Sequence, residues 1–228
     1  MLVNVGKLMS HTSTKGGGGV KHPFNPSLVD AWFMSGFSNN DKPSSIRGVK
    51  GNEVVLKNFA FTSESGFGEG NYEGALVFDG VDDYGMCTGL PIMDDFTLIC
   101  KREILNTSPG YVANKGLDNA GAFHFESSIQ TSDSNSTTGV WSYGTGNRVK
   151  LEESEVSWMT KNSYNGIELK TGNLSDVNQL YLCRFSSSYT KAAIYYFALY
   201  NKSLTPEEVE EEKVKLENYW EGGKNELA

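Results

Sequence analysis

Short segments in which hydrophobic and polar residues alternate follow one another along the chain from Leu28 onward. They are rich in Val, Ile, Tyr, Phe and Trp, and Gly, Asn and Asp separate them, which favours strands joined by turns. The predicted strands are residues 28–33, 52–61, 75–80, 84–90, 96–102, 110–116, 121–128, 140–144, 179–185 and 192–201. Within residues 156–172, Asn165-Gly166 predicts a tight hairpin turn between two alternating segments. Turn signals about every 8 to 12 residues are typical of an all-β sandwich or barrel, and we predict this fold class.

One helix is predicted near the C-terminus, over residues 205–220. Thr205 can cap its first turn, and Glu208 stands where a capping box places its acidic residue. Gly222 is expected to end the helix. One face should dock on the rest of the domain, and the remaining acidic residues are expected on a solvated face. The docking face consists of Val209, Leu216 and Trp220.

Residues 1–25 differ from the rest of the chain, because they are polar and contain the glycine tract Gly16–Gly19. A glycine run forms a flexible hinge. We therefore predict a flexible N-terminal arm over residues 1–25 and a β-sandwich domain, including the helix, over residues 26–228. The arm is either an unstructured tail or a contact to a second copy. Its segment LVNV can add a strand to another sheet, which would make a homo-oligomer through the arm.

Charge and composition exclude several functions. The 228-residue chain has a formal net charge of −8, and phosphate backbones repel an acidic surface that has no lysine–arginine cluster. Nucleic acid is therefore not an expected partner, and no membrane is expected, since no apolar run reaches the length of a spanning helix. The N-terminus lacks the apolar core of a secretory signal. We expect the chain at a virion or extracellular surface, and otherwise in the cytoplasm.

The three cysteines, Cys87, Cys100 and Cys183, are too few and too irregular for a disulfide framework. We expect buried, reduced thiols, with a Cys87–Cys100 bridge as the open alternative.

One acidic stretch of the sequence could form either a tight turn or a metal site. Asp79, Asp82 and Asp83 fall within LVFDGVDDYGMC, between two predicted strands. Gly80 and aspartates that accept main-chain N–H bonds are typical of a tight turn, which is the favoured interpretation. The alternative is Ca²⁺, which needs six to eight oxygens from several segments. Apart from calcium at these three aspartates, no cofactor is expected.

Four segments resemble laminin-G-like domains of the concanavalin A-like lectin/glucanase superfamily, of a kind seen in gut Bacteroides and their phages. In chain order they are LVDAWFMSG, ALVFDGVDDYG, DDFTLICKRE and AAIYYFALYNKSLTPEEV, which together span about residues 27–210. The second is similar to the family signature FDGxDDYV. The resemblance implies a jelly-roll sandwich of two antiparallel sheets, and it supports the turn interpretation, because the FDG segment is mostly architectural in that family.

Carbohydrate binding requires exposed aromatic rings for stacking, with amide or charged groups for the hydroxyls. The candidate glycan-binding residues are Trp141, Tyr143, Asn147, Arg148 and Trp158. For the tryptophans the competing interpretation is a place in the core.

Catalysis is not expected. Glucanases of the resembled superfamily carry the pattern E-x-D-x-x-E on one strand, and this sequence lacks it; EESEVSW, at 152–158, has no intervening aspartate. The histidines are scattered, and no other catalytic or phosphate-binding motif occurs. A hydrolase with an atypical site would instead show two carboxyl groups about 5 to 10 Å apart across a groove.

The sequence thus predicts a non-catalytic binding or assembly module that contacts carbohydrate or neighbouring protein subunits and is displayed on a phage virion or particle surface. A secreted carbohydrate-binding module is the first alternative, and a glycoside hydrolase with an atypical site is the second.

Overall fold

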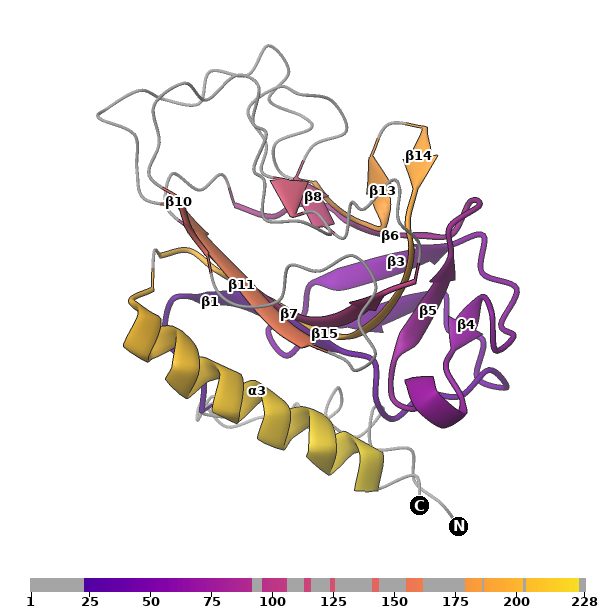
Figure 1. The fold of residues 1–228 in the computed structure, drawn as a ribbon, viewed down its shortest axis with the longest axis horizontal. Helices are drawn as coiled ribbons and strands as arrows, with labels where there is room; N and C mark the ends of the chain where they lie inside the picture. Colours follow the sequence, from indigo (N-terminus) through magenta and orange to yellow (C-terminus); the bar gives the residue numbers. More distant parts are fainter. Residues whose placement is uncertain are drawn as a thin grey trace, which may run out of the picture.

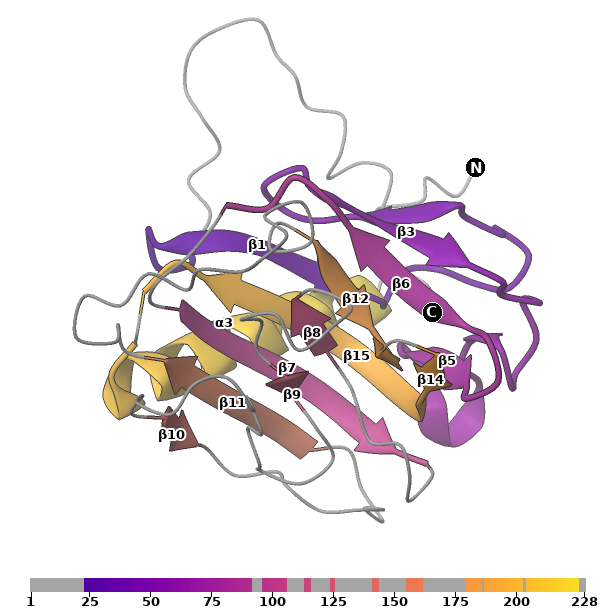
Figure 2. The same cartoon turned by 90° about the horizontal axis from the view of Figure 1, so that it is seen from above.

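The computed structural model describes residues 23–91, 96–105, 113–115, 124–125, 141–143, 155–161, 179–185, 187–202 and 204–225. Two antiparallel sheets are stacked face to face, and helix α3 (Pro206–Asn225) lies across the outer face of one of them (Figure 1). Figure 2 looks down through one sheet onto the other, with the helix behind both. The prediction of an all-β sandwich of two antiparallel sheets with a C-terminal helix is confirmed.

The back sheet is the one that carries the helix. Its strands run in the order β10-β11-β7-β15-β5-β4, and β1 also pairs with β15. Their bounds are Leu28–Phe33 (β1), Gly66–Phe67 (β4), Leu76–Asp79 (β5), Phe96–Ile104 (β7), Trp141–Tyr143 (β10), Glu155–Lys161 (β11) and Lys191–Tyr200 (β15). The register of β15 shifts between Ile194 and Tyr196. Before the shift β15 pairs with β5, and after it with β1.

The front sheet has the strand order β2-β3-β6-β12-β8-β9. Its bounds are Ser45–Arg47 (β2), Glu53–Lys57 (β3), Tyr84–Cys87 (β6), Ala113–Lys115 (β8), His124–Phe125 (β9) and Leu180–Leu182 (β12). A small hairpin, β13 (Arg184–Phe185) and β14 (Ser188–Tyr189), follows β12, and η1 (Gly70–Tyr72) is a short 3₁₀ helix. The sequence pattern missed β2, β4 and β14. It also extended the strand at 52–61 too far, because Asn58 has a φ of 68° and turns the chain after Lys57.

The core fills the space between the sheets. Alternation along each strand sends every second side chain into it, and burial of one large apolar side chain contributes about 1.5–3 kcal/mol. Its largest fully buried apolar members include Trp32, Met34, Phe78, Leu98 and Phe197.

Helix α3 begins as the sequence predicts. The Glu208 main-chain N–H donates to Thr205 Oγ1 at 3.2 Å, and the Glu208 carboxylate accepts the Thr205 N–H at 2.9 Å, which completes the capping box. The predicted docking face is confirmed, since the side chains of Val209, Leu216 and Trp220 are all buried against the back sheet. No helix in the described ranges combines the length and apolar character of a bilayer span.

The predicted end of the helix is wrong, because α3 continues past Gly222 to Asn225. Trp220 is anchored in the domain, and its main-chain carbonyl accepts the Ser35 hydroxyl at 3.0 Å. Tertiary contacts therefore hold the last turns of α3 in place, although Gly222 by itself would favour the end of the helix.

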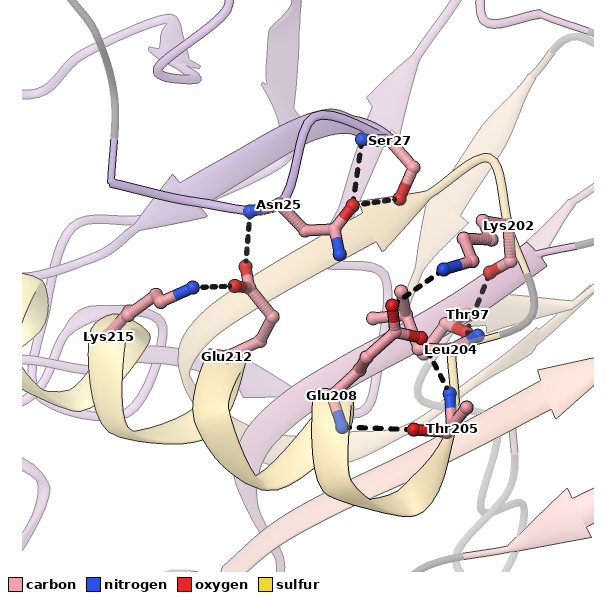
Figure 3. A network of polar contacts seen from close by, with 9 residues as sticks. All are labelled: Asn25, Ser27, Thr97, Lys202, Leu204, Thr205, Glu208, Glu212 and Lys215. Carbon is pink, nitrogen blue, oxygen red and sulfur yellow. Dashed lines mark hydrogen bonds and ion pairs between the residues drawn. The ribbon is translucent and has the colours of Figure 1, made fainter.

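One acidic residue of the helix is not solvated, contrary to the sequence prediction. The Glu212 side chain is buried and accepts the Tyr200 hydroxyl at 3.0 Å. It also accepts the Asn25 main-chain N–H at 3.0 Å (Figure 3). Lys215 Nζ lies 2.5 Å from its other oxygen. The carboxylate thus joins the helix, β15 and the segment that leads into β1. Burial, and then the Glu212 charge, raise the pKa of the Tyr200 phenol far above its usual value.

A second buried carboxylate closes the free edge of β1. Asp30 Oδ1 accepts the N–H groups of Ala31 and Lys50, both at 2.8 Å, and Oδ2 accepts the N–H and side-chain amide of Asn52 at 2.7 and 2.9 Å. The backbone at Gly48 lies so close to the Asp30 carboxylate that a Cβ on Gly48 would be 2.2 Å from Asp30 Oδ1. Only glycine fits there.

Candidate functional site

The acidic stretch forms the turn between β5 and β6. Asp79 Oδ1 accepts the main-chain N–H of Val81 at 2.7 Å, and more distantly those of Asp82 and Asp83 at 3.3 and 3.4 Å. In return, Asp83 Oδ2 accepts the Asp79 N–H at 3.0 Å. Gly80 has a φ of 78°, and a Cβ there would lie 2.8 Å from the main-chain nitrogen of Lys191. These contacts are those of the hydrogen-bonded turn that the sequence favours.

The same turn gathers negative charge at one point. One carboxylate oxygen from each of Asp79, Asp82 and Asp83 lies within 4.8 Å of the other two. Asp83 is fully buried, and burial raises its pKa to about 6; the charges of Asp79 and Asp82 add to the rise, while hydrogen bonds from Ser65 and Asp79 oppose it.

These aspartates are the residues that would hold Ca²⁺. They offer three carboxylates from one turn, but Asp79 Oδ1 and Asp83 Oδ2 already accept main-chain N–H groups, which leaves fewer than the six to eight oxygens that the ion requires. The donor set by itself fits a turn better than a calcium centre. The calcium site stays a prediction. The three carboxylates also lie side by side in one turn. A hydrolase with an atypical site would instead have two carboxyl groups that face each other across a groove.

The predicted glycan-binding residues are only partly described. Trp141 and Tyr143 lie on β10, opposite Lys161 and Met159 of β11. Trp158 lies on β11, opposite Ile99 of β7. Their side chains, and residues Asn147 and Arg148 entirely, lie outside the described part of the chain. Their role therefore stays a prediction.

A different aromatic group is well described on the front sheet. We call Tyr84, Tyr181, Arg184 and Tyr189 the tyrosine–arginine cluster. In β12 the leucines on either side of Tyr181 point into the core, so Tyr181 faces away from the back sheet. In β6 the same alternation turns Tyr84 outward, because Gly85 and Cys87 are buried. Tyr181 is opposite Met86 in the β6–β12 register, so the two tyrosines share one face.

Arginine lies at the centre of the cluster. The Arg184 guanidinium carbon is 4.5 Å from the centroid of the Tyr84 ring, and 5.9 and 5.8 Å from those of Tyr181 and Tyr189. The Tyr84 ring is itself 6.4 Å from Tyr181 and 6.3 Å from Tyr189. Tyr181 is almost completely buried, and its hydroxyl donates to Gln179 at 2.5 Å. The other three side chains are partly exposed.

The chain bends sharply to place this arginine. Cys183, between β12 and β13, has a φ of 59°, a conformation that costs energy for residues other than glycine. Its side chain is fully buried, while the next residue, Arg184, lies among the rings. The sequence shows that Tyr84 and Tyr181 alternate with apolar residues, but not that their strands are neighbours.

All three cysteines are free and buried, as expected, so the alternative Cys87–Cys100 bridge is not formed. Burial raises the pKa of the Cys87 and Cys100 thiols to about 12, which keeps them protonated and unreactive.

No protein-family model and no curated protein matches the sequence. Among solved structures, Trypanosoma rangeli sialidase in complex with 2,3-difluoro-KDN is similar at 16% identity and a TM-score of 0.48, over 86% of this chain and 33% of that one. The same sialidase with sialic acid matches at 14% identity and 0.48, over 82% and 32%. The catalytic domain of an α-1,3-glucanase with tetrasaccharides matches at 10% and 0.32, over 80% and 29%.

These matches contradict the expectation that the chain is not an enzyme, because the matched proteins are sialidases and a glucanase, which are glycoside hydrolases. We withdraw that expectation. The chain spans about a third of the length of these proteins, so their activities are not assigned to it.

Proposed function

We propose that this chain is a carbohydrate-binding domain of the laminin-G-like, concanavalin A-like type, and that it binds sugar at the tyrosine–arginine cluster. The cluster carries the proposal. Tyrosine combines a flat apolar ring, which packs on the C–H face of a pyranose, with a hydroxyl that hydrogen-bonds at its edge. A few polar groups set among apolar surface are typical of sites that bind small molecules.

The surrounding structure supports this position. Strand pairing between β6 and β12 holds Tyr84 and Tyr181, and the hairpin β13–β14 brings Arg184 and Tyr189 over them. Side chains on a sheet are held more firmly than side chains on loops, which lowers the entropy that binding must overcome. The four sequence segments that resemble laminin-G-like domains support the same class of protein.

Glycan-array screening of the full chain, followed by calorimetry with the best oligosaccharide, tests the proposal. Tyr84→Ala should weaken binding about 3- to 10-fold, the effect of one aromatic contact. Tyr72→Ala, which removes another partly buried tyrosine at a distant site in η1, should leave binding unchanged. Reducing ends are measured in the same samples, so that turnover is detected separately from binding. Absence of glycan binding by the wild type, or equal loss in both variants, would refute the proposal.

Two finer predictions concern the setting of the domain. The sequence predicts contact with neighbouring subunits through residues 1–25, and display on a virion or extracellular surface. Light scattering on the full chain and on a chain without residues 2–19 tests the first. A monomer in both cases would show that the arm does not assemble the protein.

A further inference from the structure

The exposed face of helix α3 fits the N-terminal arm of the same chain. We propose that residues 2–15 bind along this face, and that the glycine tract Gly16–Gly19 is the hinge at which the arm turns back. The inference goes beyond the proposed function, because it concerns the side of the molecule that carries α3 and does not depend on glycan binding.

The receiving surface is a line of side chains along α3. They recur at intervals of three and four residues, which places them on one side of the helix, and all of them are exposed. We call them the α3 stripe, which consists of Glu207, Glu211, Val214, Asn218 and Glu221. Val214 is 61% exposed and is one of two strongly exposed large apolar side chains in the described part of the chain. The stripe thus has an apolar centre and carries carboxylates toward both ends.

The arm complements the α3 stripe in charge and in apolar character. Residues 1–22 contain three of the 20 basic side chains and none of the 28 acidic ones. An exposed ion pair changes an equilibrium by only about two- to five-fold, so charge alone would hold the arm weakly. The segment LVNVGKLM, residues 2–9, also has apolar side chains on both sides of Lys7, and these can cover Val214.

The arm enters the domain beside the α3 stripe. The Asn25 main-chain N–H donates to Glu212 at 3.0 Å (Figure 3). One residue earlier, the centroid of the Phe24 ring lies 5.6 Å from that of Tyr219, about two helical turns further along α3. From Asn25 toward the N-terminus, the chain therefore follows the flank of α3 toward the C-terminal end of the helix. An arm that turns back there meets the stripe first at Glu221.

The length of the arm favours binding within one chain. The α3 stripe is about 21 Å long at 1.5 Å per residue, and residues 2–15 reach about 45 Å when they are extended. Residues 16–22 connect them to the domain. A short flexible tether gives an effective concentration in the millimolar range, so a contact that is weak between separate molecules becomes populated within one. A neighbouring chain would have to compete with this tethered contact.

Paramagnetic broadening in NMR spectra of the full chain tests this contact. A nitroxide is attached through Ser10→Cys, and the three native cysteines stay unlabelled because they are buried. The nitroxide should broaden the amide signals of the α3 stripe and leave those of β3, on the front sheet, sharp. Sodium chloride at about 0.5 M should weaken the broadening, because salt screens exposed charges.

Matched variants separate the α3 stripe from the overall charge. E207Q/E211Q/E221Q removes the three carboxylates of the stripe and should reduce the broadening about 5-fold or more, the combined effect of several exposed ion pairs. E53Q/E64Q/E69Q removes three exposed carboxylates elsewhere and should leave the broadening unchanged. The salt dependence uses the native surface of α3, so the test does not require that any variant of this helix folds.

Each outcome decides the proposal. Sharp signals from the α3 stripe in the nitroxide-labelled chain would overturn it, and so would equal losses of broadening in the two charge variants. A mixture of nitroxide-labelled chains with ¹⁵N-labelled chains that carry no nitroxide identifies the source of the arm. Broadening of the ¹⁵N-labelled stripe in this mixture would place the arm on a second copy and refute binding within one chain. None of these results bears on glycan binding, which is measured separately.

Discussion

Replacing Asp83 with asparagine removes the buried charge of the β5–β6 turn and keeps most of its geometry. The amide oxygen of the substituted side chain can still accept the Asp79 main-chain N–H that Asp83 Oδ2 accepts at 3.0 Å. The substitution therefore isolates the ionisation of the carboxyl group from the architecture of the turn.

The size and sign of the effect follow from the pKa. The folded state raises the Asp83 pKa from 3.8 to about 6, so the folded protein binds this proton more tightly than the unfolded chain. The stability that this proton provides is fully present below about pH 4 and is lost as the pH rises through about 6. Two pH units at 1.36 kcal/mol each correspond to about 3 kcal/mol. An asparagine amide does not ionise, so the D83N variant avoids this loss.

Urea unfolding, followed by tryptophan fluorescence at several pH values from about 4 to 8, measures the effect. The unfolding free energy of D83N relative to wild type should rise by about 3 kcal/mol across this range. D41N is the matched control: Asp41 caps an exposed turn by accepting the Ser38 N–H and hydroxyl, and its relative stability should change much less. A D83N difference that does not change with pH would refute the raised pKa.

The same titration tests the predicted calcium site. A cation bound by Asp79, Asp82 and Asp83 would favour the ionised carboxylate, so millimolar CaCl₂ should abolish the pH-dependent difference between D83N and wild type. An identical difference in CaCl₂ and in chelator would show that the turn does not bind calcium.

Three further predictions concern packing and reactivity. G48A places a methyl group against the Asp30 carboxylate and should destabilise the protein by about 1–3 kcal/mol. G222A lies in open space on α3 and should stabilise the protein by about 0.5–1 kcal/mol. Thermal and urea unfolding measure both effects. E212A leaves three donors, the Tyr200 hydroxyl, the Asn25 N–H and Lys215 Nζ, without their acceptor and should cost about 2–4 kcal/mol. E211A, one exposed position away, should change stability by less than about 0.5 kcal/mol, and equal effects would contradict the role of the buried carboxylate. The three buried cysteines should react with Ellman's reagent at pH 8 only after unfolding, and rapid labelling of the native protein would refute their burial.

Local signals in the sequence predicted those parts of the fold that depend on neighbouring residues. Thr205 and Glu208 lie one helical turn apart, so their reciprocal capping bonds could be predicted without knowing the rest of the fold. The turn at Asp79 could be predicted for the same reason, since its acceptors and donors lie within five residues. Gly222 shows the limit of such rules, because the contact between Ser35 and Trp220 outweighs the local preference.

The tyrosine–arginine cluster could not be predicted in the same way. Its members come from β6, from β12 and from the hairpin after it, and the pairing of β6 with β12 joins segments that are far apart in the sequence. Cys183 adopts a left-handed conformation, which gives Arg184 its position. Because cysteine usually avoids this conformation, the sequence does not indicate it. The burial of Glu212 was missed for a related reason, because its partners Asn25 and Tyr200 are brought to it by the fold.

The position of β15 determines when this protein can fold during synthesis. β15 pairs with β1, β5 and β7, although it is the last strand of the back sheet to leave the ribosome. Until then the earlier strands expose unpaired edges and apolar faces, and β1 waits longest, since Leu28 pairs with Tyr200. Long-range antiparallel pairing of this kind folds slowly and exposes the nascent chain to aggregation. Expression yield should therefore depend on chaperones that protect nascent chains, and truncations that remove residues 191–200 should yield insoluble product.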